Sequence, residues 1–117
     1  MQSFGEYLRT RRESLRETDR EFSLRKVAQR LGIQPSYLSK IERGEVSPPS
    51  EATTRKLANE LRVDSDLLLA MAGKVSSDLQ DVIRKRPELF AELIRGLKEM
   101  PDHAVLRLVR EVRDGEW

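Results

Sequence analysis

Residues 23–44 (SLRKVAQRLGIQPSYLSKIERG) restrict the possible folds of this chain more than any other stretch. In the first half, apolar residues recur at the spacing that places them on one face of a helix: Leu24, Val27, Ala28 and Leu31. Gly32 follows, and glycine most readily adopts the positive φ that a sharp exit from a helix needs. The pattern therefore predicts a helix that ends in a glycine turn.

A second short helix is expected directly after this turn. Pro35 suits the first turn of that helix, where no backbone amide is needed, and Gly44 is placed to end it. Leu38 and Ile41 share the face that would pack on the first helix, and Ala28 is small enough to lie where the two helices cross. This spacing of a small residue, a glycine and two aliphatic residues is typical of a helix-turn-helix.

The composition favours an all-α chain. Of the 117 residues, 38% are hydrophobic but only 5% are aromatic, which is low for a β-sandwich or barrel. The absence of cysteine excludes disulfides and thiolate metal sites. The longest apolar run, residues 67–72, is too short to cross a bilayer, and the N-terminus has no secretory signal pattern. We therefore expect a cytoplasmic protein with no membrane association.

The other helices of a first domain can be placed from capping residues and apolar spacing. A first helix is expected over residues 3–14, and two more over residues 50–61 and 66–72, which gives a five-helix bundle within residues 1–72. The residues expected to face its core from the last two helices are Ala52, Leu57, Ala58, Leu61, Leu67, Leu68 and Met71. The charged residues 13–21 lack apolar periodicity and fit either an extension of the first helix or a loop.

Residues 73–117 are expected to form a helical extension of about three short amphipathic helices, interrupted by Pro87 and Pro101. Their apolar residues form a broader stripe than an isolated exposed helix would carry: Leu89, Phe90, Leu93, Ile94, Leu97, Val105, Leu108, Val109 and Val112. So few residues make a thin core, and the stripe must therefore be covered. We interpret it as a dimerisation surface, with packing on the first domain as the alternative.

Neither the charge pattern nor the residue chemistry indicates an enzyme. Residues 1–45 hold ten basic and seven acidic side chains, a small positive excess that only weakly favours nucleic acid as a partner. The single histidine, His103, lies in no metal-binding or catalytic pattern, and no glycine-rich phosphate loop is present. No cofactor, metal ion or small-molecule effector is indicated.

Three segments make residues 1–72 resemble the phage-repressor-type helix-turn-helix of the Xre/Cro family: FGEYLRTRR, SLRKVAQRLGIQPSYLSKIERGEVSPPS and LANELRVDSDLLL. The family fold is a five-helix bundle that binds operator DNA as a two-fold dimer. The resemblance implies that residues 24–31 cross above the DNA backbone while residues 35–43 lie in the major groove.

Matched position by position, the resemblance implies a set of base-reading residues, namely Gln34, Pro35, Ser36, Ser39 and Lys40. Lys40 has the chemistry to donate to guanine and Gln34 to pair with adenine, whereas Pro35 offers only apolar contact. The residues that we assign to DNA phosphates are Arg25, Lys26, Gln29, Tyr37 and Arg43.

Glu42 is an acidic residue on the helix that would face DNA. The family pattern implies a structural ion pair between Glu42 and Arg12 of the first helix. We expect this pair to fix the DNA-reading helix to the rest of the bundle.

These features predict a sequence-specific, double-stranded DNA-binding transcriptional regulator. We expect a repressor that acts as a homodimer on a pseudo-palindromic operator, although nothing in the sequence excludes activation. The alternative is an antitoxin-like or partner-binding regulator whose C-terminal helices bind another protein. The two hypotheses differ in whether these helices contact a second copy of the chain or a different partner.

Overall fold

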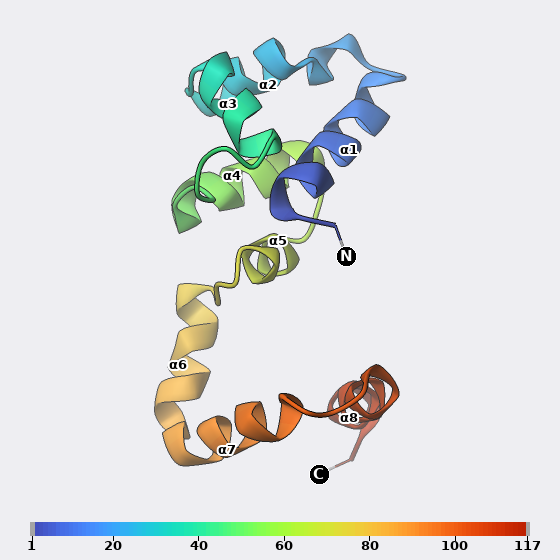
Figure 1. The fold of residues 1–117 in the computed structure, drawn as a ribbon, viewed down its shortest axis with the longest axis vertical. Helices are drawn as coiled ribbons and strands as arrows, with labels where there is room; N and C mark the ends of the chain where they lie inside the picture. The colour runs from blue at the N-terminus through green and yellow to red at the C-terminus, as the bar shows by residue number, and fades with distance from the viewer. Residues whose placement is uncertain (1, 117) are drawn as a thin grey trace. The chain divides into compact units, whose positions relative to one another are not determined.

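The computed structural model describes residues 2–116, and the regular secondary structure of these residues is entirely helical (Figure 1). The elements are α1 (Phe4–Arg16), the short 3-10 helix η1 (Arg20–Phe22), α2 (Leu24–Leu31), α3 (Pro35–Glu42), α4 (Glu51–Leu61), α5 (Ser65–Met71), α6 (Ser77–Lys85), α7 (Pro87–Leu97) and α8 (Asp102–Asp114). The predicted all-α fold, with five helices followed by three, is confirmed. Residue 1 of the expected first domain (1–72) and residue 117 of the expected helical extension (73–117) lie outside the described residues.

The chain divides into two compact units, Met1–Ser76 and Ser77–Trp117. The first contains α1 to α5 with η1, and the second contains α6 to α8. Within the described residues, no helix combines the length and the apolar character that crossing a bilayer requires.

Each α-helix of the first unit begins either with a side chain that accepts an unpaired backbone N–H or with a proline, which has no N–H to pair. A side-chain oxygen accepts an N–H of the first turn at four of these starts, from Ser3 for α1, Ser23 for α2, Ser50 for α4 and Asp64 for α5. Pro35 occupies the first position of α3, where no amide is needed. Gly32 ends α2 with a φ of 71°, in agreement with the predicted glycine turn.

The core of the first unit is apolar and comes from every α-helix of that unit. Its side chains include Leu8, Val27, Ala28, Leu38, Ile41, Leu57, Leu61 and Leu68. Because α2 and α3 both contribute, the glycine turn between them is held at a fixed angle by packing on both sides.

Two of the residues predicted to face this core are instead exposed. Ala52 lies on the solvent side of α4, because it is five residues before Leu57 and therefore about 140° away around the helix. Thr54 takes the buried position instead. In α5, Leu67 is 47% exposed while Leu68 and Leu69 are buried, since three consecutive leucines cannot all share one face of a helix.

The charged stretch before α2 combines the two predicted alternatives. Its first residues extend α1 as far as Arg16, and the chain then turns through Asp19 into η1. Asp19 caps η1 by accepting the N–H of Glu21 at 2.9 Å. The turn brings Phe22 into the core, where only 5% of its surface is exposed.

The second unit has no buried side chain among its described residues. Large apolar side chains of all three helices are exposed instead, namely Leu79, Val82, Leu89, Leu93, Ile94, Leu106, Val109 and Val112. These helices therefore lack the apolar burial that normally stabilises a packed helical unit.

At Gly5, the backbone of α1 lies close to the backbone at the end of α3. A Cβ atom placed there would meet the carbonyl oxygen of Ile41 and would lie 2.6 Å from the carbonyl oxygen of Glu42. No larger residue fits without moving α3, because both obstructing atoms belong to the backbone. No pattern in the sequence predicts this contact.

We predict that Gly5→Ala lowers the free energy of unfolding of the first unit by about 1–3 kcal/mol, because the added methyl group overpacks the contact with α3. In an unconstrained helix the same substitution stabilises by roughly 0.5–1 kcal/mol. Gly96→Ala in α7 is the matched control, because a Cβ there meets nothing within 4 Å. Chemical denaturation measures both variants, and a stabilised Gly5→Ala variant would contradict the proposed close contact.

Candidate nucleic-acid interface

The exposed side of α3 carries most of the predicted base-reading residues. Leu38 and Ile41 turn the opposite side of the helix into the core, so the polar side chains between them point outward. Gln34, Ser36 and Lys40 are exposed, and Pro35 and Ser39 are half-buried. Within residues 2–116, the Lys40 ammonium group forms no hydrogen bond or ion pair, so it is available to a ligand.

The residues assigned to DNA phosphates lie beside this surface. Those on α2 and α3 that are exposed are Arg25, Lys26, Gln29, Tyr37 and Arg43. Arg25 and Gln29 line a hollow of about 320 Å³ together with Ile33 and Pro35, at the turn between the two helices. The hollow therefore places Arg25 and Gln29 of α2 beside Pro35, the first residue of α3, across the intervening turn.

Several of these cations have carboxylate partners, but the partners are also exposed. Lys26 Nζ lies 3.8 Å from Glu21 Oε1, and Arg43 Nη1 lies 3.1 Å from Glu45 Oε1. Exposed pairs of this kind contribute only about 0–1 kcal/mol and are screened by salt. They do not prevent the cations from contacting a phosphate group.

Arg12 and Glu42, the residues that the family resemblance pairs, form a buried ion pair. Arg12 Nε donates to Glu42 Oε2 at 2.7 Å and Arg12 Nη2 donates to Glu42 Oε1 at 2.9 Å. The two residues are only 4% and 6% exposed. The hydrogen bond to Glu42 raises the pKa of Arg12, which outweighs the opposing effect of burial.

The same guanidinium group also contacts the segment before α2. Arg12 Nη1 donates to the carbonyl oxygen of Phe22 at 3.2 Å. One side chain of α1 therefore contacts both the last residue of α3 and the last residue of η1. This arrangement fixes the two ends of the helix-turn-helix to the same point on α1.

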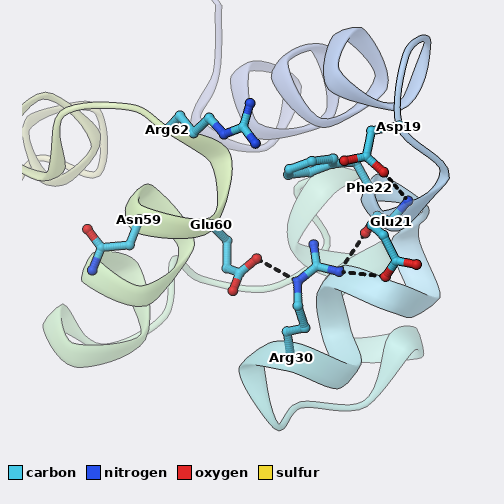
Figure 2. A pocket seen from close by; sticks show the side chains of 7 residues that line it. All are labelled: Asp19, Glu21, Phe22, Arg30, Asn59, Glu60 and Arg62. Atoms are coloured by element: carbon cyan, nitrogen blue, oxygen red, sulfur yellow. Dashed lines mark hydrogen bonds and ion pairs between the residues drawn. The ribbon is translucent and has the colours of Figure 1, made fainter.

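A second charged cluster lies between η1, α2 and α4 (Figure 2). Arg30 Nε donates to Glu60 Oε2 at 2.7 Å, and Arg30 Nη1 donates to the carbonyl oxygen of Glu21 at 2.7 Å. The Cζ atoms of Arg30 and Arg62 lie 5.3 Å and 5.4 Å from the centre of the Phe22 ring, within range of cation–π attraction. The cluster borders a hollow of about 390 Å³ and ties α2 to α4.

Sequence reasoning did not find this second cluster, because its members come from three separate segments. Only the backbone of the folded chain marks this cluster. Arg62 ends α4 with a φ of 57°, and within residues 2–116 it is the one residue other than glycine with a positive φ. This conformation is costly for a residue with a Cβ. The ring of Phe22 and the carbonyl contacts of Arg11 to Leu61 and Arg62 hold the end of α4 in place.

The second unit contains an apolar groove of about 370 Å³ between α7 and α8. It is lined by Leu93, Leu97, Val105, Leu108, Val109, Val112 and Arg113. Six of these residues belong to the predicted dimerisation stripe. Of the remaining three, Leu89 and Ile94 are exposed outside the groove and Phe90 is half-buried.

Two helices joined by a glycine turn, the second with an exposed polar face, make this a helix-turn-helix protein. Comparison with known sequences gives the family. Residues 3–71 match the model of a family described as a helix-turn-helix domain. The chain therefore belongs to this helix-turn-helix family. No solved structure matches it significantly.

The similar proteins are named as regulators of transcription. The chain is 35% identical over 75 residues to the HTH-type transcriptional repressor RghR of Bacillus subtilis (strain 168), which covers 64% of this chain and 52% of the relative. It is 33% identical over 82 residues to the uncharacterised HTH-type transcriptional regulator RghRB of the same organism, covering 70% of this chain and 55% of the relative. A third relative, an uncharacterised HTH-type transcriptional regulator of Mycobacterium tuberculosis, is 35% identical over 69 residues, which are 59% of this chain and 45% of the relative. The chain spans about half the length of the curated relatives it matches.

We predict that Glu42→Gln destabilises the first unit by about 3–5 kcal/mol, because it leaves the buried Arg12 charge without its counter-ion. Glu45→Gln is the control: it removes the same charge from the exposed pair with Arg43, and we expect a change of at most about 1 kcal/mol. Thermal and chemical denaturation monitored by circular dichroism measure both. Equal stability of the two variants would show that the buried pair does not hold α3.

Proposed function

We propose that this protein is a sequence-specific DNA-binding regulator of transcription that acts as a homodimer. The observation that carries the proposal is the combination of a rigidly anchored α3 with an exposed polar face on its other side. A helix used to read base edges must be fixed in orientation, since a small displacement breaks its hydrogen bonds to the bases.

Direct reading of bases would come from the exposed face of α3. Lys40 has a free ammonium group suited to the O6 and N7 acceptors of guanine, and Gln34 has the paired donor and acceptor suited to adenine. Ser36 and Ser39 can donate to or accept from a base edge, while Pro35 offers apolar contact to a thymine methyl group.

Affinity without sequence preference would come from the cations beside α3. Arg25, Lys26 and Arg43 carry the charge, with Gln29 and Tyr37 as neutral donors to phosphate oxygens. Binding should therefore weaken steeply as the salt concentration rises, because each neutralised phosphate releases counterions.

The direction of regulation is proposed from the relatives. RghR is named a transcriptional repressor, and it is 35% identical to this chain over 75 residues. We therefore favour repression, in which the bound protein occupies a promoter.

Association of two copies would occur through the second unit. Its helices expose eight large apolar side chains and enclose the groove between α7 and α8. An apolar surface of this extent on so small a unit is typical of a protein–protein interface. A two-fold dimer would present its α3 helices to successive major grooves about 34 Å apart, and the operator would then be a pseudo-palindrome.

The alternative is that this groove binds a different protein, as in an antitoxin. The same apolar side chains would serve either partner, so the oligomeric state of the purified chain decides between the two.

Selection of bound sites from random duplexes should yield an enriched pseudo-palindromic sequence. We predict that Lys40→Ala weakens binding to the selected duplex by about 1–3 kcal/mol and relaxes the preference at one position of each half-site. Lys56→Ala, which removes an exposed lysine from α4, is the control and should leave the selected sequence unchanged. An equal loss of affinity for selected and random DNA would contradict base reading by Lys40.

We predict that the purified chain is a dimer by size-exclusion chromatography with light scattering, and that Leu93→Glu converts it to a monomer by placing a charge in the groove. Ala91→Glu adds the same charge at an exposed position of α7 outside the groove and should leave the dimer intact. If the unmodified chain is a monomer over the whole concentration range, the groove serves another partner and the homodimer proposal is wrong.

A further inference from the structure

We propose that Arg9 and Arg43 together bind one backbone phosphate of DNA, in a hollow where α1, α2 and α3 meet, and that Glu13 and Glu45 compete with this phosphate. The proposal rests on the proposed DNA-binding function. It adds a residue of α1 to the contact surface, and it assigns two acidic residues a role in limiting the affinity.

The hollow has a volume of about 190 Å³ and is open to solvent beside the buried Arg12–Glu42 pair. Besides that pair, its walls are formed by Arg9 and Glu13 of α1, Leu24 of α2, Ser39 of α3, and Arg43, which directly follows α3. The two cationic side chains come from different segments of the chain, so only the folded bundle brings them to one place.

The charge of the hollow depends on two exposed side chains. Arg12 and Glu42 neutralise each other through two hydrogen bonds and have little charge to offer a ligand. The side chains of Arg9 and Arg43 are 59% and 52% exposed, so both guanidinium groups can turn toward an anion that enters from solvent.

Each arginine is occupied by a carboxylate that a phosphate can replace. Arg9 Nε lies 3.2 Å from Glu13 Oε1, and Arg43 Nη1 lies 3.1 Å from Glu45 Oε1. Exposed pairs of this kind contribute little free energy. A DNA phosphate accepts two parallel N–H bonds from a guanidinium group and also releases condensed counterions, so the exchange favours DNA.

The position of the hollow points to DNA as the source of the phosphate. Ser39 lines the hollow and also belongs to the proposed base-reading face of α3. A strand whose bases are read by α3 therefore passes the mouth of the hollow, and its backbone presents a phosphate there. The carboxylates of Glu13 and Glu45 then weaken binding to every DNA sequence alike.

Binding to a random-sequence duplex of about three helical turns tests the proposal over a range of salt concentrations. For each protomer bound, we expect Arg9→Gln to weaken binding by about three- to tenfold and to reduce the slope of log K against log salt by about 1. We expect Glu13→Gln to tighten binding by about two- to threefold, because Arg9 is then no longer held by a carboxylate. Both effects should be equal on the selected duplex, because a phosphate contact carries no sequence information.

The double variant separates a direct contact from a general effect of charge. If Glu13 acts by pairing with Arg9, then Glu13→Gln does not increase the affinity for DNA of a chain that already carries Arg9→Gln. Glu17→Gln is the matched control: it makes the same charge change at the end of α1, outside the hollow, and should leave the affinity unchanged. Unchanged thermal melting verifies that each variant is folded.

Two results would overturn the inference. One is an Arg9→Gln variant with the affinity and salt slope of the unmodified chain. The other is an increase in DNA affinity on Glu13→Gln that is also found in a chain carrying Arg9→Gln. Either result, together with a selected sequence that depends on Lys40, would leave the proposed function intact. A chain that binds no duplex at all would instead remove the proposed function itself.

Discussion

The arrangement of the first unit depends on the buried ion pair between Arg12 and Glu42. Its two hydrogen bonds, with the third from Arg12 to the carbonyl oxygen of Phe22, connect α1 to both ends of the helix-turn-helix. Burying two charges is costly, and the pair is stable only when its hydrogen bonds are satisfied in one geometry. Gly5 adds a steric condition, since the backbone of α3 lies where a side chain would be. Charge pairing and close packing thus fix the same helix in one orientation.

The parts of the fold that could be predicted from sequence are those set by local chemistry. Gly32 needed a positive φ and Pro35 lacked an amide, and both signals depend only on neighbouring residues. The error at Ala52 came from a helix with few large apolar residues, where a small change of phase exchanges the buried and exposed faces. The error at Leu67 came from a run of three leucines, of which only two can face the core. The apolar spacing alone could not decide between these phases.

The unpredicted parts of the candidate site depend on contacts between distant segments. Nothing in the sequence around Phe22 predicts that Arg30 and Arg62 approach its ring. Arg9 cannot be distinguished by sequence from other exposed arginines of α1, and only the fold shows that it shares a hollow with Arg43. The ion pair of Arg12 could be named only because a family resemblance supplied both partners. In each case the sequence specifies the side chains, whereas the tertiary fold specifies which of them meet.

The second unit, which has no buried side chain among its described residues, has a consequence for how much of this protein a cell can hold. If a partner covers this unit, as we propose, part of its folding free energy comes from that contact, and its ordering would be coupled to association. Chains made in excess of such a partner would keep their apolar helices open to proteases. Degradation would then remove the uncovered chains and spare the covered ones, and the half-life of the protein would depend on its assembly.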